Sequence, residues 1–237
     1  MSGEILTFLR TEKKYIINDY QKEELMKIFD EYMELDKYCL NNQTYHIQNI
    51  YYDTERDALI NRSLEKPMYK EKLRARKYYG TKYCFLEIKK KFDGVVGKRR
   101  IILSLDELDN VMNGRPIKER DNYSDRQILK EIQNVLSRYK LKPKVFISYD
   151  RLGYFSKVDP SLRVTFDDNL HAKRNNFEWD KDDYETDILP KGMYVLEIKS
   201  SHNFPLWLVR ALSNLKIYTH SFSKYGTEFV KYKGKDF

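Results

Sequence analysis

The stretch MYKEKLRARKY, residues 68–78, decides how the rest of this chain is interpreted. Side chains two residues apart in a β-strand point to the same face of a sheet. Four cations occupy alternate positions of this stretch, namely Lys70, Lys72, Arg74 and Arg76. Leu73 and Ala75 fall on the opposite face, although Glu71 and Lys77 interrupt the pattern. The stretch therefore predicts a strand with one basic face and one face suited to a hydrophobic core.

Four later stretches repeat this segregation of charged and apolar residues. Their polar residues at alternate positions are Glu87, Lys89 and Lys91, then Lys98 and Arg100, then Arg163, Thr165 and Asp167, and finally Glu197 and Lys199. An open antiparallel sheet with one face in water also alternates in this way, and that interpretation stays open. Stacked like charges favour an anion on this face, because a solvated face usually mixes charges to limit repulsion. In a closed sheet with these residues inward, each contact to phosphate would be strengthened.

Length, charge and cysteine content bound the class of protein. A chain of 237 residues can bury a sizeable core, and we expect one domain over residues 1–237. Its formal charge of +8, from 44 basic and 36 acidic residues, favours a polyanionic partner. Cys39 and Cys84 are too few for a disulfide framework, and no apolar window approaches the about 20 residues of a membrane span. We therefore expect a cytoplasmic location.

Residue periodicity and turn signals predict strands interrupted by helices. The predicted strands cover residues 8–18, 44–53, 68–78, 82–91, 95–103, 144–155, 161–168 and 193–200. The predicted helices cover residues 20–32, 54–64, 105–113, 124–139 and 205–215, with Ser124 as an N-cap. Residues 171–190 are expected to form an extended loop that contains one irregular strand, and 221–226 a turn. The dipeptide Asp93-Gly94 predicts a hairpin turn between the strands at 82–91 and 95–103. The strands are numerous enough to close a barrel, so the predicted class is α+β, an antiparallel β-barrel with several flanking helices.

The tetrapeptide Leu-Glu-Ile-Lys occurs twice, at residues 86–89 and 196–199, and each copy follows a strand with an arginine at matching phase. This repetition indicates two related half-barrels. Glu87 and Glu197 are acidic residues within basic faces, so they could be salt-bridge partners of lysines or ligands of a divalent cation. The sequence has no Walker A loop, Rossmann fingerprint or G-x-S-x-G context, and its histidines lack metal-ligand spacing.

These residues together resemble the VTC domain, the polyphosphate polymerase domain of vacuolar transporter chaperone complexes, within the triphosphate tunnel (CYTH-like) superfamily. The resemblance covers nearly the whole chain. It depends on the order and spacing of several short motifs, which are Glu12-Lys13-Lys14-Tyr15, Tyr51-Tyr52-Asp53-Thr54, Leu73-Arg74-Ala75-Arg76, Leu86-Glu87-Ile88-Lys89, Lys98-Arg99-Arg100, Tyr149-Asp150-Arg151, Leu196-Glu197-Ile198-Lys199 and Ser223-Lys224-Tyr225-Gly226.

The resemblance implies a tunnel that binds ATP and a divalent metal, Mn²⁺ or Mg²⁺, and transfers the γ-phosphoryl group to a growing polyphosphate chain. By position, it implies that the phosphate-gripping residues are Lys14, Arg62, Arg74, Arg76, Lys89, Arg151, Arg163 and Lys224. The charged strand faces add the phosphate-binding candidates Lys72, Lys98, Arg100 and Lys199. The resemblance assigns Glu197 as the metal ligand, and Glu87 is a second candidate from its place in a basic face.

Two departures from the superfamily shape the functional hypothesis. Its hydrolases usually carry an E-x-E-x-K strand near the N-terminus, whereas residues 11–14 offer one glutamate, which favours a polymerase. The chain has no transmembrane segment of its own, so a membrane partner would be a separate protein. The alternatives are a metal-dependent triphosphatase or polyphosphatase, and a non-catalytic module that binds polyphosphate. Nucleic acid is not expected as a partner, because one basic and aromatic cluster is weak support for it.

Overall fold

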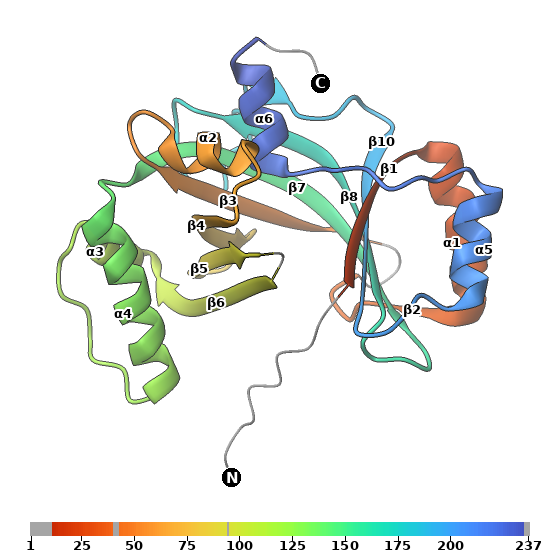
Figure 1. The fold of residues 1–237 in the computed structure, drawn as a ribbon, viewed down its shortest axis with the longest axis horizontal. Helices are drawn as coiled ribbons and strands as arrows, with labels where there is room; N and C mark the ends of the chain where they lie inside the picture. Colours follow the sequence, from red (N-terminus) through yellow and green to blue (C-terminus); the bar gives the residue numbers. More distant parts are fainter. Residues whose placement is uncertain (1–10, 40–42, 94, 235–237) are drawn as a thin grey trace. The chain divides into compact units, whose positions relative to one another are not determined.

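The computed structural model describes residues 11–39, 43–93 and 95–234 (Figure 1). Within these ranges the strands are β1 Thr11–Asn18, β2 Met33–Leu35, β3 Tyr45–Asp53, β4 Tyr69–Tyr78, β5 Tyr83–Phe92, β6 Val95–Ser104, β7 Lys142–Ser156, β8 Arg163–Lys173, β9 Thr186–Asp187 and β10 Met193–Ser200. The helices are α1 Asp19–Tyr32, α2 Ala58–Leu64, α3 Leu105–Met112, α4 Tyr123–Arg138, α5 Leu206–Asn214 and α6 Lys224–Tyr232.

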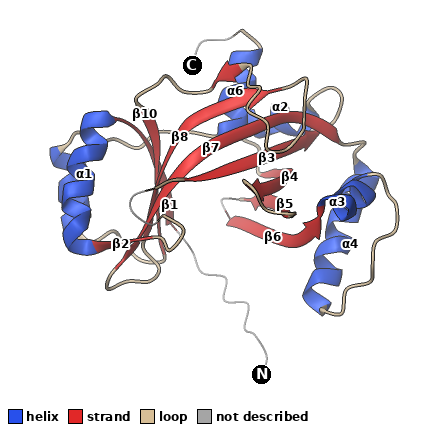
Figure 2. Ribbon diagram, turned by 180° about the vertical axis from the view of Figure 1, so that it is seen from behind, coloured by secondary structure: helices blue, strands red, loops and turns tan. Residues whose placement is uncertain are grey.

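The described strands belong to one sheet. Its main order is β1-β10-β8-β7-β3-β4-β5-β6, while β2 pairs with β7 and β9 pairs with β8. The registered pairs run antiparallel, and helices separate groups of strands along the chain (Figure 2). The predicted α+β class, an antiparallel sheet with flanking helices, is confirmed.

The chain forms two compact units, and each is described by itself. Unit 1 comprises Met1–Tyr45, Asp150–Asn169 and Leu189–Phe222, and unit 2 comprises His46–Tyr149, Leu170–Ile188 and Ser223–Phe237. Each unit has its own hydrophobic core. The expectation of a single domain over residues 1–237 stays a prediction.

The core of unit 1 lies between its strands and the helices α1 and α5. Tyr15 and Ile17 of β1 pack with Leu196 and Ile198 of β10, and Phe29 of α1 is fully buried against them. Because successive side chains of a strand alternate, the residues between these positions lie on the opposite face. Lys14 and Glu197, which are paired across β1 and β10, are therefore on the face away from this core.

The core of unit 2 lies on one face of β4, β5 and β6. Its strand residues are Leu73, Ala75, Leu86, Ile88, Ile101 and Leu103. They pack with apolar side chains of α3 and α4, including the fully buried Ile132. This packing leaves the other face of the three strands to the alternating cations.

Polar caps explain where several helices begin. Asn18 accepts a hydrogen bond from the Gln21 amide at 2.9 Å, and the Gln21 side chain accepts one from the Asn18 amide at 3.1 Å. Ser104 and Glu107 form the same reciprocal capping box before α3. The prediction of Ser124 as the N-cap of α4 is wrong, because Asn122 fills that place and accepts from the Ser124 amide at 2.8 Å. An asparagine side chain two residues upstream reaches the same free amides.

Three further differences from the expected elements have local causes. The predicted turn at residues 221–226 contains the start of helix α6, capped by Ser223 and held by the buried rings of Tyr225 and Phe229. The expected loop 171–190 begins with the end of β8, and the two-residue strand β9 lies where one irregular strand was expected. The short β2 was not predicted, since three residues give no measurable periodicity. The predicted strand positions 8–10 and the turn residue Gly94 lie outside the described residues.

Candidate functional site

The basic face of unit 2 is organised in rows across the strands. Antiparallel register places Tyr51, Arg74, Glu87 and Arg100 opposite one another on β3, β4, β5 and β6. The next row holds Lys72, Lys89 and Lys98 on β4, β5 and β6. Side chains directly opposite on one face are close enough to interact. The predicted cations of these three strands therefore gather on one surface.

Glu87 is the carboxylate at the centre of this surface. Its side chain is 2% exposed, and Arg74 contacts its Oε2 through Nε and Nη2, both at 2.7 Å. Lys98 Nζ lies 2.8 Å from the other oxygen, Oε1. Burial raises the pKa of Glu87, but Arg74, Arg76 and Lys98 outweigh burial and hold that pKa far below its ordinary value. Glu87 is thus an ionised counter-ion with both oxygens occupied by cations.

Lys98 is a cation of this group whose pKa lies well below its ordinary value. Burial of its ammonium lowers the pKa, Glu87 opposes that effect, and the guanidiniums of Arg74 and Arg76 lower it further, to about 8. The stem of the side chain is 41% exposed, so a ligand can reach it. A lysine with this pKa gains a full charge when a polyanion binds beside it.

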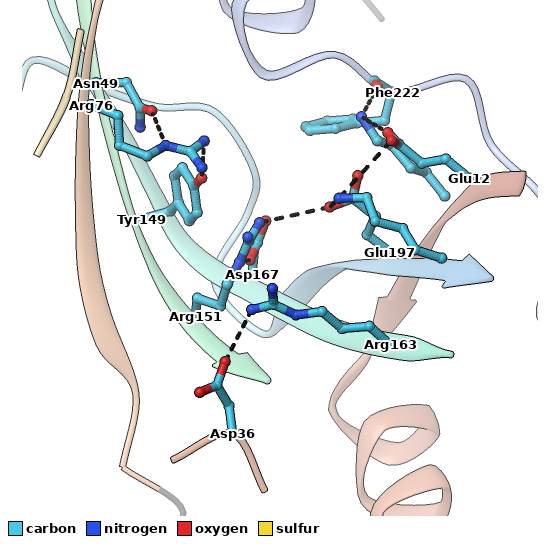
Figure 3. Close-up of polar contacts among 12 residues, drawn as sticks. Glu12, Asp36, Asn49, Arg76, Tyr149, Arg151, Arg163, Asp167, Glu197 and Phe222 are labelled. Carbon is cyan, nitrogen blue, oxygen red and sulfur yellow. Dashed lines mark hydrogen bonds and ion pairs between the residues drawn. The ribbon is translucent and has the colours of Figure 1, made fainter. Parts of the chain in front are cut away.

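Arg76 is held rigidly on the same face of unit 2. Its Nε donates to Asn49 Oδ1 and its Nη2 donates to Tyr149 OH, both at 3.0 Å (Figure 3). Lys224, at the start of α6, places its ammonium 4.2 Å from the centre of the Tyr149 ring. The guanidinium therefore keeps one orientation, which reduces the entropy lost when it binds an oxyanion.

Two other predicted residues of unit 2 have different surroundings. Lys72 donates to the Ser223 hydroxyl at 3.2 Å, which connects β4 to the N-terminus of α6. Arg62, on α2, stacks at 5.9 Å over the ring of Tyr69. Both residues stay predictions as phosphate ligands, and so does the exposed Lys89 on β5.

The polar face of unit 1 is centred on Glu197. Lys199 Nζ lies 3.0 Å from Glu197 Oε2, and Arg151 Nη2 lies 3.8 Å from the same oxygen (Figure 3). Burial raises the pKa of Glu197, but the surrounding cations and a hydrogen bond with Glu12 outweigh it and hold the pKa well below its ordinary value. Lys14 lies beside Glu12, with 3.6 Å between the ammonium and the carboxylate, and donates to the Phe222 carbonyl at 3.2 Å.

Arg151 and Arg163 are each anchored by an aspartate of unit 1. Arg151 forms a two-pronged pair with the buried Asp167, at 2.6 and 2.8 Å. Arg163 Nη2 donates to Asp36 Oδ2 at 3.0 Å (Figure 3). Its guanidinium lies 4.9 Å from the centre of the Phe155 ring. These pairs fix the guanidinium planes, as a site for phosphate oxygens requires.

The residues of unit 1 fit a divalent cation better than those around Glu87. Lys199 Nζ lies 3.0 Å from Glu197 and 4.0 Å from Glu12, so two carboxylates converge on one ammonium, at a place where a cation could bind. Mg²⁺ is commonly held by one or two carboxylates together with phosphate oxygens and water. Within residues 11–39, 43–93 and 95–234, no cluster of three or more His, Cys, Asp or Glu side chains is placed to bind a metal. A site here would therefore take part of its ligands from the substrate.

Sequence reasoning gave Glu12 no role in the site. Its position two residues before Lys14 places both side chains on one face of β1, and that alternation is the signal that was available. The anchoring partners Asp36, Asn49 and Tyr149 were not predicted either. They come from distant parts of the sequence, and nothing local indicates which cation each one contacts.

Comparison with known proteins identifies the family. The family model of the VTC domain matches residues 9–232, so the chain belongs to the VTC domain family. A Hippeastrum protein, HpAC1, named after adenylyl cyclase and described as having a dominant triphosphatase activity, has a similar structure. Its TM-score is 0.51 at 16% identity, and the match covers 97% of this chain and 98% of that one.

A second solved structure shares the fold. This Bacillus halodurans protein, named after adenylate cyclase, has a TM-score of 0.50 at 14% identity, and the match covers 90% of this chain and 92% of that one. Identities this low show a common fold alone. A search of curated proteins finds no match. In the described part of the chain, no helix combines the length and apolar character needed to cross a membrane.

Proposed function

We propose that this protein is an ATP-dependent polyphosphate polymerase that uses a divalent metal. The observation that carries the proposal is the basic sheet face of unit 2, where arginines and lysines of β4, β5 and β6 surround the buried carboxylate of Glu87 while the opposite face is packed into a core. Such a surface is electrostatically strained without an anion, because its cations outnumber the carboxylate they surround. Membership of the VTC domain family supports a triphosphate or polyphosphate as that anion.

The protein's part in the reaction would be to position phosphates and neutralise their charge. Fixed guanidiniums such as Arg76 and Arg151 can each hold two phosphate oxygens, aligning donor and acceptor for an in-line transfer. The terminal oxygen of the polymer forms the new bond to the γ-phosphorus, and the bond from that phosphorus to the β-phosphate oxygen breaks to release ADP. The attacking oxygen is already ionised, so no side chain needs to act as a general base.

Glu12 and Glu197 would hold the metal in this proposal. A bound divalent ion supplies charge stabilisation to triphosphate oxygens. The neighbouring Lys14 and Lys199 would then contact the phosphates rather than only the two carboxylates. This division of labour differs from that around Glu87, whose oxygens are already taken by Arg74 and Lys98.

A second candidate function is hydrolysis of a triphosphate or polyphosphate. The fold shared with HpAC1, which is described as a triphosphatase, favours it. The same basic faces would hold the substrate, and water would take the place of the polymer end. A third candidate, a non-catalytic module for polyphosphate, needs the basic faces and no turnover.

Product analysis distinguishes these functions. With purified protein, ATP and Mn²⁺ or Mg²⁺, we expect long-chain polyphosphate to form, with one ADP released for each phosphate added. Gel electrophoresis measures the polymer, and ³¹P NMR spectroscopy measures both products. Release of free phosphate without formation of polymer would show that the protein is a hydrolase and not a polymerase. Tight binding of tripolyphosphate without turnover would support the non-catalytic binding module. Absence of binding would exclude the polymerase, the hydrolase and the binding module.

Binding of tripolyphosphate is expected to weaken as Lys98 loses its proton. Between pH 7 and pH 9 a group with a pKa of about 8 goes from mostly charged to mostly neutral, and the affinity should fall about tenfold. Any ionisation of the ligand in this range is the same for every variant, so the contribution of Lys98 is the difference between the wild type and a variant that keeps its charge at this position. Calorimetric titration without metal measures the effect.

The matched control for this pH dependence is Lys98→Arg. Arginine stays protonated up to pH 9, so the decline should largely disappear in this variant. A decline of equal size in both proteins would show that another group causes it.

A further inference from the structure

One end of the basic face of unit 2 is aromatic rather than charged. Phe85 lies directly opposite Arg76 on β4 and Ile102 on β6, so all three side chains share this face. The rings of Tyr78 and Tyr83 stand nearly perpendicular to the Phe85 ring, at 6.0 and 5.8 Å between centroids. These side chains form an aromatic shelf, defined here as Tyr78, Tyr83, Phe85 and Ile102.

Arg100 lies over this shelf. Its guanidinium carbon is 4.8 Å from the centre of the Phe85 ring, although the residue directly opposite Arg100 on β5 is Glu87. A guanidinium over an aromatic ring offers a second planar group beside it, and bases commonly stack on arginine planes and aromatic rings. The shelf and Arg100 together therefore offer a stacking platform one row away from the Arg74 and Glu87 pair.

The shelf is not accounted for by packing of the core. The core of unit 2 lies on the other face of these strands, with Leu86 and Ile101 fully buried there. On the basic face, Tyr83 is 43% exposed and Ile102 is 56% exposed. An apolar surface left open at the edge of a cation-rich face suits a ligand that is apolar at one end and anionic at the other.

The order of the rows gives this surface a direction. From the shelf, the strands lead first to Arg74, Glu87 and Arg100, and then to the lysine row of Lys72, Lys89 and Lys98. Phe85 and Lys89 are four residues apart on β5, a separation of about 13 Å along a strand. A nucleoside triphosphate in an extended conformation spans this order of length, with its planar base at one end and its charge at the other.

We propose that the aromatic shelf is the subsite for the nucleobase of the nucleoside triphosphate, and that the phosphates extend from it toward the lysine row. This proposal rests on the function proposed above and adds the orientation of the nucleotide. Stacking is tolerant of base identity, because every base has a π-face. The shelf therefore selects nucleotides over inorganic tripolyphosphate, and discriminates little among bases.

Replacement of Phe85 separates the base from the phosphates experimentally. In Phe85→Leu, the affinity for ATP should fall about five- to a hundredfold, since stacking of a base contributes on the order of 1–3 kcal/mol. The affinity for tripolyphosphate should stay within about twofold, because that ligand has no base to stack. Calorimetric titrations of both ligands, under the same salt and without metal, give the ratio of the two affinities.

Two further variants keep this test decisive. Phe92→Leu removes an exposed aromatic ring from the same strand, but on the opposite face, and should leave the affinity ratio unchanged. Ile102→Ser alters the exposed rim of the shelf and should lower the affinity for ATP in the same direction, even if Phe85→Leu folds poorly. Circular dichroism and melting curves establish folding for each variant.

The outcomes distinguish this proposal from the function on which it rests. An unchanged ratio in both Phe85→Leu and Ile102→Ser, with ATP and tripolyphosphate still bound, would overturn the base subsite and leave the proposed function standing. A parallel loss of both ligands would assign the shelf to phosphate binding instead. If the wild-type protein bound neither ligand, the proposed function itself would be overturned.

Discussion

Glu197→Gln is expected to lower metal-dependent phosphoryl transfer by at least about a hundredfold, while tripolyphosphate binding without metal is retained or strengthened. The amide preserves the shape of the side chain but removes the charge that a divalent cation needs. It also removes the ion pairs of Lys199 and Arg151 with Glu197, so both cations remain available to bind an anion. Initial rates over a range of Mn²⁺ or Mg²⁺ concentrations, with a parallel calorimetric titration, measure both effects.

The control for this variant is Glu34→Gln, which removes an exposed carboxylate from β2 of the same unit. It should keep the wild-type rate and metal dependence. Glu12→Gln should raise the metal concentration needed for half-maximal rate, because Glu12 is the second carboxylate of the pair. Full activity in Glu197→Gln would contradict the assignment of this residue as a metal ligand.

Glu87→Gln is expected to strengthen anion binding without changing the metal dependence of turnover. Removing the counter-ion leaves Arg74 and Lys98 without their shared carboxylate, so tripolyphosphate affinity should rise at least about threefold. The same change should lower the free energy of unfolding by about 3 kcal/mol at neutral pH, because it leaves cations of a buried pair uncompensated. Denaturant unfolding monitored by tryptophan fluorescence measures the loss of stability.

The pH dependence of the free energy of unfolding should also report the ion pairs of Glu87. Glu87 has a pKa far below the about 4.3 of an unfolded glutamate, so its contribution to stability is present above that value and is lost as the pH falls toward the folded-state pKa. The free energy of unfolding of the wild type should therefore decline between pH 5 and pH 3, and the decline should be shallower in Glu87→Gln.

Catalytic measurements on Glu87→Gln decide between the two roles that a carboxylate in a basic face can have. A counter-ion role predicts retained turnover with unchanged metal dependence. Loss of turnover, together with unchanged tripolyphosphate affinity and stability, would instead make Glu87 a metal ligand. Glu71→Gln is a suitable comparison, because Glu71 is also buried on β4 of unit 2 and pairs with Arg138 on the opposite face.

The division of each strand into two faces could be derived from the sequence. In residues 68–78 the alternation of cations with Leu73 and Ala75 is a local property of a pleated strand, and it survives in β4 as found. The same logic identified the cations of β5, β6, β8 and β10, and the turn signal Asp93-Gly94 predicted the hairpin between β5 and β6. Helices with long apolar stripes, such as α1 and α4, were also predictable to within a few residues.

The partners of the charged side chains could not be derived in this way. Local alternation says that Arg76 and Glu197 lie on a polar face, but it does not say that Asn49 and Tyr149 hold the first or that Glu12 reaches the second. Those contacts depend on strand register and on pairings between segments many residues apart. Helix α6 was missed for a related reason, since its short apolar stripe is stabilised mainly by tertiary packing.

By itself, then, the sequence determined most of the strands and which face of each is basic, and it predicted an anionic ligand. Only the tertiary structure decided that Glu87 is enclosed by Arg74 and Lys98, while Glu197 shares the contact of Lys199 with a second carboxylate, Glu12. The physical reason is that side-chain direction follows from the geometry of one strand. The net charge and the burial of a site depend instead on which strands lie beside it.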